Sequence, residues 1–271
     1  MRAYLINLER RNDRLRKMTD QLNALGIPFE RIDALDARSI ADADLQRQFR
    51  DDGPLGVIPK GDKCCALSHA LAWQAFARSG ESHAIILEDD VALDATAAPL
   101  LRDDAWIPKD VDLLKLERYG PPNQRVLIDE RIDIGNGHKI GRLRSRHTGA
   151  AAYIMSRRAA LTLTEHVDCW WLPVDHLLFN LNNSPLAEHL RPHQMTPAIA
   201  HQSTALGGHT DIEEWRIGLR HFDWRYVKRE TVRAYYELRL LPAQIMRWAR
   251  QESTLVRVDE PASSNIPLVS D

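Results

Sequence analysis

The sequence predicts an α/β fold, with a mixed, mostly parallel sheet flanked by helices and a helical extension at the C-terminal end. The first indication is a strand–helix–strand opening, with apolar strands at 3–8 and 29–32. The second is a pair of later apolar strands, 84–93 and 112–117, that both run into acidic residues. Strands that alternate with helices are typical of sheets whose faces are covered by helices.

The segment between the first two strands is expected to be a helix. Large apolar side chains recur through it at helical spacing: Leu15, Met18, Leu22 and Leu25. Gly26, followed by Pro28, marks its end. Arg14 stands near its start, where an arginine is ordinarily a surface residue.

A second long helix is expected after a loop at 51–61. Ser39 and Asp42 form a capping-box-like start for a short polar helix that ends near Phe49. Residues 62–80 then form a helix that is nearly apolar on one side and carries His69. A histidine in that position is more often a hydrogen-bonded core residue than a catalytic one.

The strand at 84–93 carries three adjacent carboxylates: Glu88, Asp89 and Asp90. Three like charges repel one another, and the apolar strand before them offers no partner. In an extended chain Glu88 and Asp90 would point to one side and Asp89 to the other. Such a pair suits a hard divalent cation, Mn²⁺ or Mg²⁺, that in turn binds phosphate. The alternative is a solvated acidic turn.

Further acids follow the later elements. A helix is expected at 95–101, a long loop with a possible hairpin at 118–139, a strand at 149–155 and a helix at 157–166. If the strands at 84–93 and 112–117 are parallel, Glu117 lies on the same edge as the acidic triplet, where ligands bind in open α/β sheets. Asp175 falls in the first turn of a helix that starts near 172, where a capping role is the ordinary explanation.

Residues 1–209 are expected to form the main domain and 210–251 a set of basic amphipathic helices. These helices should start at Thr210 and Glu213 and break at Pro242. Their basic face and Trp/Leu/Tyr face suit either a membrane surface with anionic lipids or packing on the domain. Residues 252–271 are rich in Ser and Pro and are expected to be disordered.

Composition narrows the classes of protein further. The chain has 271 residues, 27% of them charged, and a net charge of −2, which does not favour a nucleic acid partner. No apolar run approaches the ~20 residues of a membrane-spanning helix. Cys64, Cys65 and Cys169 show neither a disulfide framework nor a zinc spacing, as expected in a reducing cytosol.

Seven motifs together resemble glycosyltransferase family 25, the lipopolysaccharide and lipooligosaccharide glycosyltransferases that include bacterial β-galactosyltransferases. The resemblance covers roughly residues 1–205. The motifs stand in this order: Leu5-Ile6-Asn7-Leu8-Glu9-Arg10 with Arg14, Asp33-Ala34, Asp62 to His69, Ile85 to Val91, Leu116-Glu117, Ala152 to Arg157, and Pro173-Val174-Asp175.

The resemblance implies a GT-A-like domain, a nucleotide-sugar donor such as UDP-galactose, and inversion at the anomeric carbon. Carried over by position, it implies donor-binding residues: Asn7, Arg14, Asp33, Ser68, His69 and Asp89. It also implies that Glu88 and Asp90 bind the metal. Two departures stand out, because Asp62 replaces the usual Glu and His201, a candidate third metal ligand, matches no family position.

The two remaining acids receive separate roles. Asp175 is expected to be the base that deprotonates the acceptor hydroxyl, and Glu117 to bind hydroxyls of the donor sugar. The acceptor would be a glycolipid or oligosaccharide, and the enzyme cytoplasmic, on the inner face of the bacterial inner membrane. The competing hypotheses are a catalytically inactive nucleotide-sugar-binding module and a metal-dependent phosphohydrolase.

Overall fold

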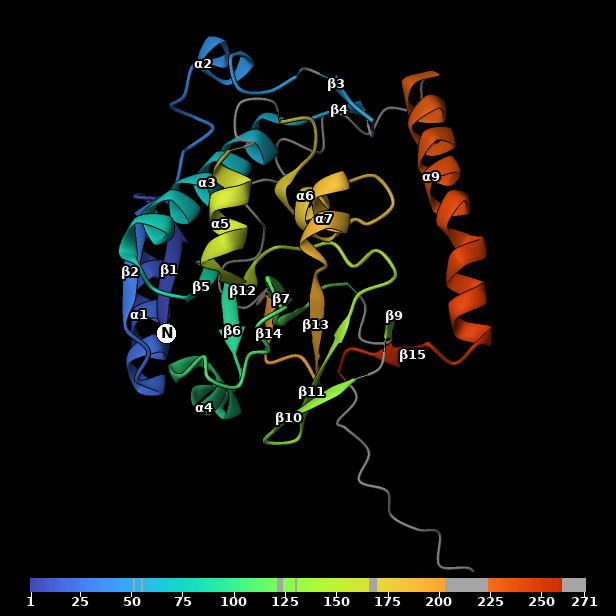
Figure 1. Ribbon diagram of the computed structural model, residues 1–271. Helices are drawn as coiled ribbons and strands as arrows, with labels where there is room; N and C mark the ends of the chain where they lie inside the picture. The colour runs from blue at the N-terminus through green and yellow to red at the C-terminus, as the bar shows by residue number, and fades with distance from the viewer. Residues whose placement is uncertain are drawn as a thin grey trace, which may run out of the picture.

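The computed structural model describes residues 1–50, 52–54, 56–120, 124–129, 131–165, 170–202 and 224–259. Its centre is an eight-stranded sheet in the order β10-β11-β13-β7-β12-β5-β1-β2 (Figure 1). The strands of this sheet are β1 (Arg2–Asn7), β2 (Phe29–Asp33), β5 (His83–Glu88), β7 (Leu113–Lys115), β10 (Ile132–Gly135), β11 (His138–Arg142), β12 (Ala152–Ser156) and β13 (His193–Thr196).

The sheet is mixed. β1 pairs in parallel with β2 and β5, and β13 pairs in parallel with β7. The pairs β12–β5, β12–β7, β11–β13 and β10–β11 are antiparallel. The predicted mixed α/β sheet is confirmed, although parallel pairs are not in the majority. Because β12 is antiparallel to both of its neighbours, β5 and β7 run in the same direction. The acidic residues that follow these two strands therefore lie at the same edge of the sheet, as predicted.

Helices cover both faces of this sheet. On one face, α3 (Lys60–Ser79), α5 (Arg157–Thr164), α6 (Val174–Phe179) and α7 (Pro185–Leu190) build a core that contains Trp73 and Phe76. On the other face, α1 (Asn12–Leu25) and α4 (Ala98–Arg102) pack Met18, Leu22 and Leu101 against Leu5 and Leu87. Successive side chains of a strand point to opposite faces, so Ile85 and Ile86 enter different cores.

Short strands and helices complete the body. Beside the main sheet lie β6 (Val91–Leu93), β14 (Ala200–Gln202) and β8 (Glu117–Arg118), in that order. The strands β3 (Asp52–Gly53) and β4 (Gly56–Val57) pair within the predicted loop, α2 (Asp42–Gln46) is shorter than expected, and η1 (Ala95–Ala97) precedes α4. The hairpin β10–β11 lies where a hairpin was expected. α7 and β13 were missed.

The C-terminal region differs from the prediction in two respects. α9 (Trp224–Ala249) continues through Pro242 without the expected break. Pro242 is exposed, so the carbonyl that loses its helical partner there can be hydrated. The second difference is β15 (Ser253–Arg257), which pairs with β9 (Arg125–Asp129), so the prediction of a disordered tail is wrong for these residues. Thr210 and Glu213, the boundary at 209/210 and residues 260–271 lie outside the described residues.

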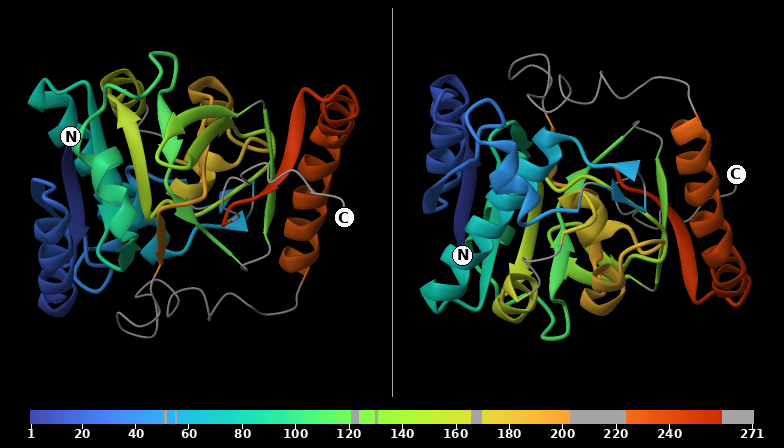
Figure 2. Two further views of the ribbon diagram at one scale, coloured as in Figure 1. Left: turned by 90° about the horizontal axis from the view of Figure 1, so that it is seen from below. Right: turned by 90° about the horizontal axis from the view of Figure 1, so that it is seen from above.

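α9 lies beside β15 on the side of the body opposite α1 (Figure 2). Its contacts with the body include polar ones, such as the hydrogen bond from Gln244 Nε2 to the Arg144 carbonyl oxygen at 2.7 Å. Large apolar side chains of α9 are 43–63% exposed: Tyr235, Leu238, Leu241, Ile245, Met246 and Trp248. We call these six residues the apolar stripe. The alternative that this stripe packs on the domain is therefore wrong.

Candidate active site

A cavity of about 310 Å³ opens at the edge of the sheet where β1, β2 and β5 end. Segments that follow these strands line it, together with the start of α3, the residues before β12 and the start of α6. Six of the residues proposed from the sequence are among its lining: Arg14, Ser68, Glu88, Asp89, Asp90 and Asp175. The edge at which the strands end is thus the functional edge expected for an α/β sheet.

The acidic triplet has a positive partner within the protein, the side chain of Arg14, whereas a divalent cation was expected in this role from the sequence. Arg14 is 5% exposed, and its Nη1 donates to Asp89 Oδ1 at 2.9 Å and to Asp90 Oδ2 at 3.5 Å. Asp89 and Asp90 form a turn rather than extended chain, so both reach toward Arg14 and the predicted alternation of sides is wrong. The expectation of a surface arginine is also wrong.

Asn7 fixes the orientation of Asp89. Its amide Nδ2 donates to Asp89 Oδ2 at 2.7 Å, and its Oδ1 accepts from Arg31 Nε at 3.0 Å. Burial raises the pKa of Asp89, although Arg14 and Asn7 donate to it. Asp33 is placed differently, because its side chain is 79% exposed and pairs with Arg31 at 2.9 Å rather than lining the cavity.

Asp90 is the least satisfied carboxylate of the triplet. Its Oδ1 is buried and has no hydrogen-bond partner within the described part of the chain. Burial, followed by repulsion from Glu88, raises its pKa to about 7. Arg14 opposes this shift but does not cancel it. A single guanidinium therefore leaves this part of the cavity with surplus negative charge above neutral pH.

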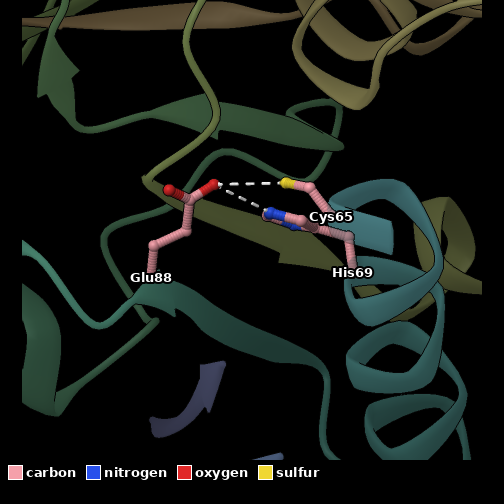
Figure 3. A group of neighbouring side chains, drawn as sticks. All are labelled: Cys65, His69 and Glu88. Carbon is pink, nitrogen blue, oxygen red and sulfur yellow. Dashed lines mark hydrogen bonds and ion pairs between the residues drawn. The ribbon is translucent and has the colours of Figure 1, made fainter. Parts of the chain in front are cut away.

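Glu88 is held by a different set of donors (Figure 3). His69 Nε2 lies 3.2 Å from Glu88 Oε1, and Cys65 Sγ lies 3.7 Å from the same oxygen. Gln202 Nε2 donates to Glu88 Oε2 at 3.5 Å. These contacts hold the Glu88 carboxylate in place beside the cavity, which it lines.

The hydrogen-bond chain behind His69 assigns its tautomer. Trp73 Nε1 donates to the Tyr153 hydroxyl oxygen at 2.6 Å, and this oxygen lies 2.9 Å from His69 Nδ1. An indole nitrogen can only donate, so the Tyr153 hydroxyl hydrogen is available for Nδ1 and the ring hydrogen of His69 belongs on Nε2, facing Glu88. His69 is therefore a buried neighbour of Glu88 rather than a residue of the cavity wall.

Ser68 joins the third helix of the chain to the segment after β2. Its Oγ donates to the Cys64 carbonyl oxygen at 2.7 Å and accepts from the Leu35 amide at 2.9 Å. Leu35 and Ser68 both line the cavity. The hydroxyl thus fixes one wall of the site.

Glu117 lies behind the cavity, not in it. It is fully buried, and its Oε1 accepts from Lys115 Nζ at 3.0 Å and from the Ala151 amide at 2.9 Å. Lys115 Nζ also donates to the carbonyl oxygens of Thr148 and Gly149. The three donors of the ammonium group are thus matched by three oxygens, which marks a buried ion pair. Burial raises the pKa of Glu117, and Lys115 opposes the shift.

Asp175 stands on the cavity wall at the start of α6. Its Oδ1 accepts from the His176 amide at 2.8 Å and its Oδ2 from the Gly149 amide at 3.3 Å. Gly149 has a φ of +92°, and a Cβ there would lie 2.7 Å from the Tyr119 ring. Only glycine fits this turn, which carries the amide that orients Asp175.

His201 is not brought into this group. It lies exposed on β14 and is not among the residues that line the cavity. The next residue, Gln202, points the other way in the strand and reaches Glu88 instead. Sequence reasoning also missed Lys115, whose position two residues before Glu117 on an apolar strand was the available signal.

An α/β sheet with an acidic, arginine-bearing cavity at its carboxyl edge is consistent with the GT-A-like class of glycosyltransferases. The model of glycosyltransferase family 25, described as LPS biosynthesis proteins, matches residues 1–178. The chain belongs to this family, so the resemblance seen in the sequence is confirmed.

Individual relatives support the same conclusion. The lipooligosaccharide biosynthesis protein lic2B of Haemophilus influenzae is 29% identical over 212 residues, which cover 75% of this chain and 76% of that protein. The lacto-N-neotetraose biosynthesis glycosyltransferase LgtB of Neisseria meningitidis is 27% identical over 209 residues, or 74% of each chain. These similarities support a glycosyltransferase role.

Proposed function

We propose that this glycosyltransferase is an inverting, metal-dependent enzyme that transfers galactose from UDP-galactose to a hydroxyl of a lipopolysaccharide, lipooligosaccharide or related glycan. One observation carries the proposal. The triplet Glu88–Asp90 and Asp175 line the same cavity from different elements, so the carboxylates proposed to bind the cation and the proposed base face one ligand space. The role of LgtB in lacto-N-neotetraose biosynthesis supports galactose as the donor sugar, and the role of lic2B in lipooligosaccharide biosynthesis supports a glycolipid acceptor, both by analogy alone.

The residues present fit a divalent cation. Asp90 offers a buried Oδ1 that has no hydrogen-bond partner among the described residues, and burial, followed by repulsion from Glu88, raises its pKa. Glu88 offers a second carboxylate in the same cavity. We assign Glu88 and Asp90 as the residues that would hold Mn²⁺ or Mg²⁺. When bound, such a cation supplies Lewis-acid stabilisation of the departing diphosphate.

Arg14 and Asn7 would act on the same side of the cavity. Arg14 holds Asp89 and Asp90 in place, and Asn7 holds Asp89. These contacts fix the triplet before a ligand arrives, so binding needs little reorganisation of the carboxylates. Preorganised charge of this kind is a major source of enzymatic rate enhancement.

Asp175 is the proposed base. It would take the proton of the acceptor hydroxyl while the oxygen attacks the anomeric carbon from the face opposite the leaving group. The amides of His176 and Gly149 donate to its two oxygens, which holds the carboxylate in place on the cavity wall. Glu117 is assigned a supporting role, because its contact with Ala151 ties the cavity wall to the Lys115 ion pair.

The deciding experiment is a donor panel measured with and without Mn²⁺. UDP-galactose, UDP-glucose, UDP-N-acetylglucosamine and GDP-mannose would be compared by thermal shift, since a ligand that binds only the folded state raises the melting temperature. Slow hydrolysis of the preferred donor would then be followed. We expect UDP-galactose with Mn²⁺ to give the largest shift and the fastest hydrolysis. Binding without any hydrolysis would favour an inactive module.

We also propose that the apolar stripe of α9 contacts a membrane that carries the acceptor. Arg239 and Arg250 are exposed on the same helical region, and cations near an apolar stripe favour anionic lipid surfaces. Among the described residues, no helix combines the length and apolar content needed to cross a bilayer. We propose a peripheral contact, at the inner face of the bacterial inner membrane.

A further inference from the structure

Cys65, His69 and Glu88 bring a sulfur, a nitrogen and an oxygen together beside the cavity (Figure 3). These atoms all lie within 4.8 Å of one another, with 3.7 Å from sulfur to oxygen and 3.2 Å from nitrogen to oxygen. Around a tetrahedral zinc ion, bonds of about 2.3 Å to sulfur and about 2.0–2.1 Å to nitrogen or oxygen separate the ligand atoms by roughly 3.3–3.6 Å. The observed spacing is close to that of a ligand set.

We propose that Cys65, His69 and Glu88 form a binding site for a thiophilic divalent cation such as Zn²⁺. Residues four positions apart on a helix lie on one face, so Cys65 and His69 of α3 both face the end of β5. Helical zinc motifs use the same spacing for two of their ligands. A thiolate selects Zn²⁺ or Co²⁺ over Mn²⁺ and Mg²⁺, which separates this site from the carboxylate set of Asp90.

Two further observations fit this assignment. The second ring nitrogen of His69 is held by the Tyr153 hydroxyl, which Trp73 holds in turn. Histidines that bind metals are commonly oriented by an N–H that the other ring nitrogen donates, and the Tyr153 oxygen is placed to accept such a hydrogen once Nε2 binds the metal. In addition, Cys65 and Glu88 line the cavity. Three protein ligands beside an open space leave a fourth position for water or for an oxygen donor of a cavity ligand.

The protons of the binding step balance without any redox partner. The Cys65 thiol releases its proton to solvent and binds as a thiolate. Metal binding at Nε2 requires that His69 carry its one hydrogen on Nδ1, the opposite of the tautomer assigned without a metal, and the Tyr153 oxygen then accepts this hydrogen. Metal bonds replace the contacts that Glu88 Oε1 now makes with Cys65 and His69.

This site was not predicted from the sequence, because the spacing of the cysteines alone gives no sign of it. The sequence contains no zinc spacing among Cys64, Cys65 and Cys169, and the third ligand arrives from a strand that follows the helix. Glu88 would also belong to the Mn²⁺ or Mg²⁺ set of the proposed function. The two cations are therefore expected to compete for one carboxylate, and this competition, unlike the site itself, rests on the proposed function.

The test is a Co²⁺ titration of the reduced, metal-free, full-length protein, followed by absorption spectroscopy. We expect a thiolate-to-cobalt charge-transfer band in the near ultraviolet and the intense visible bands of a four-coordinate ion. Added Zn²⁺ should abolish both. Absence of a charge-transfer band in the folded protein would overturn the proposal.

Matched variants identify the ligands. Loss of an outer partner of a metal site costs about 10–100-fold in affinity, so Cys65→Ser should lose the band and at least as much Co²⁺ affinity. Cys64→Ser is the control, because Cys64 is only 2% exposed and belongs to the core. Asp90→Asn should keep the band, whereas it should lose Mn²⁺-dependent UDP binding. A band that survives Cys65→Ser would contradict the assignment.

A measurement on the unmodified chain guards against variants that fail to fold. Iodoacetamide alkylation of each cysteine is followed by peptide mass spectrometry, with circular dichroism to show that the protein is folded. We expect Zn²⁺ to slow the alkylation of Cys65 at least tenfold and that of Cys64 much less. Equal rates at Cys65 with and without Zn²⁺ would overturn the proposal.

Discussion

Arg14 Nη1 lies 2.9 Å from Asp89 Oδ1, and both side chains are buried. This contact joins the start of α1 to the turn after β5, two segments 75 residues apart. It gives the acidic triplet one guanidinium for three carboxylates. A bound cation would neutralise the remaining negative charge. We therefore expect this charge to affect both cation-dependent binding and the pH dependence of stability.

Asp90→Asn is expected to weaken Mn²⁺-dependent UDP binding by at least about tenfold, since it removes one of two charged ligands from the proposed cation site. Isothermal titration calorimetry with UDP, in the presence and absence of Mn²⁺, measures this. Asp20→Asn, an exposed change on α1 with the same loss of charge, serves as the control. Unchanged UDP affinity with Mn²⁺ in Asp90→Asn would exclude the assignment.

Asp90 should also make stability depend on pH when no divalent cation is present. Its pKa in the folded protein is raised from 3.8 to about 7, so the folded state holds a proton that the unfolded state has lost. The contribution of Asp90 to stability is therefore fully present below pH 3.8 and is lost as the pH rises through about 7. The loss is no more than about 4 kcal/mol.

Urea unfolding at pH 5 and pH 8 in EDTA would measure this dependence. The wild-type protein should lose more stability between these values than Asp90→Asn, which cannot ionise at this position. Mn²⁺ at pH 8 should restore stability to the wild type. Equal pH dependence of the two proteins would show that Asp90 is not the responsible group.

Asp175→Asn is expected to lower turnover by about 10²–10⁴-fold, the usual contribution of a placed general base. UDP-sugar and metal affinity should be retained, because the change removes a proton acceptor and leaves the opposite wall intact. Steady-state kinetics combined with donor titration test both parts. Glu188→Gln, an exposed change on the neighbouring helix α7, should have near-normal turnover. Near-normal turnover in Asp175→Asn would remove it from the role of base.

Glu117→Gln is expected to destabilise the fold by about 3–5 kcal/mol, because Lys115 would be left as an unpaired buried charge. Replacing both residues, as in Lys115→Met with Glu117→Leu, should recover part of this loss. Urea unfolding of the single and double variants gives the coupling energy. If Glu117→Gln is as stable as the wild type but loses donor selectivity, then Glu117 contacts the donor sugar after all.

Charged substitutions in the apolar stripe are expected to abolish binding to anionic vesicles at low salt. Leu238 and Trp248 are 63% and 60% exposed, so Leu238→Glu with Trp248→Glu should leave the fold stable. Leu161→Glu is the matched control, since Leu161 is 46% exposed on α5. Co-sedimentation with phosphatidylglycerol and phosphatidylcholine vesicles measures the effect. A wild-type protein that stays in solution but dimerises through the stripe would contradict the membrane contact.

The elements that could be predicted are those with strong local patterns. α1 combines leucines at helical spacing with Gly26, whose φ of +65° ends the helix, and β5 is a short apolar run with 0% exposure from Ala84 to Leu87. β13 was missed because His193, Gln194 and Thr196 are polar, yet all are buried. Only their partners in the fold, such as His147 for Gln194 at 2.8 Å, explain their burial.

The sequence predicted which residues gather at the site, but not which of them form ion pairs with one another. The order of the motifs identified the residues of the cavity wall, because strands that run in one direction deliver their ends to one edge. The roles of Glu117 and Arg14 depended on burial and on partners distant in the chain, which spacing does not reveal. Glu117, at the start of β8, forms an ion pair with Lys115, at the end of β7. Arg14 is buried because it pairs with Asp89.

β15 changes what α9 can do mechanically. A helix that is attached at one end only can reorient relative to the body. The strand β15, however, follows α9 directly and is paired with β9 over five residues. Beyond it, Asp259 forms an ion pair with Arg118 of β8 at 2.6 Å. A force on the apolar stripe would thus act, through β15 and Asp259, on β9 and β8 of the body. A membrane held by that stripe would fix the direction in which the cavity faces, so the enzyme would reach acceptor glycans only within a narrow range of heights above the lipid.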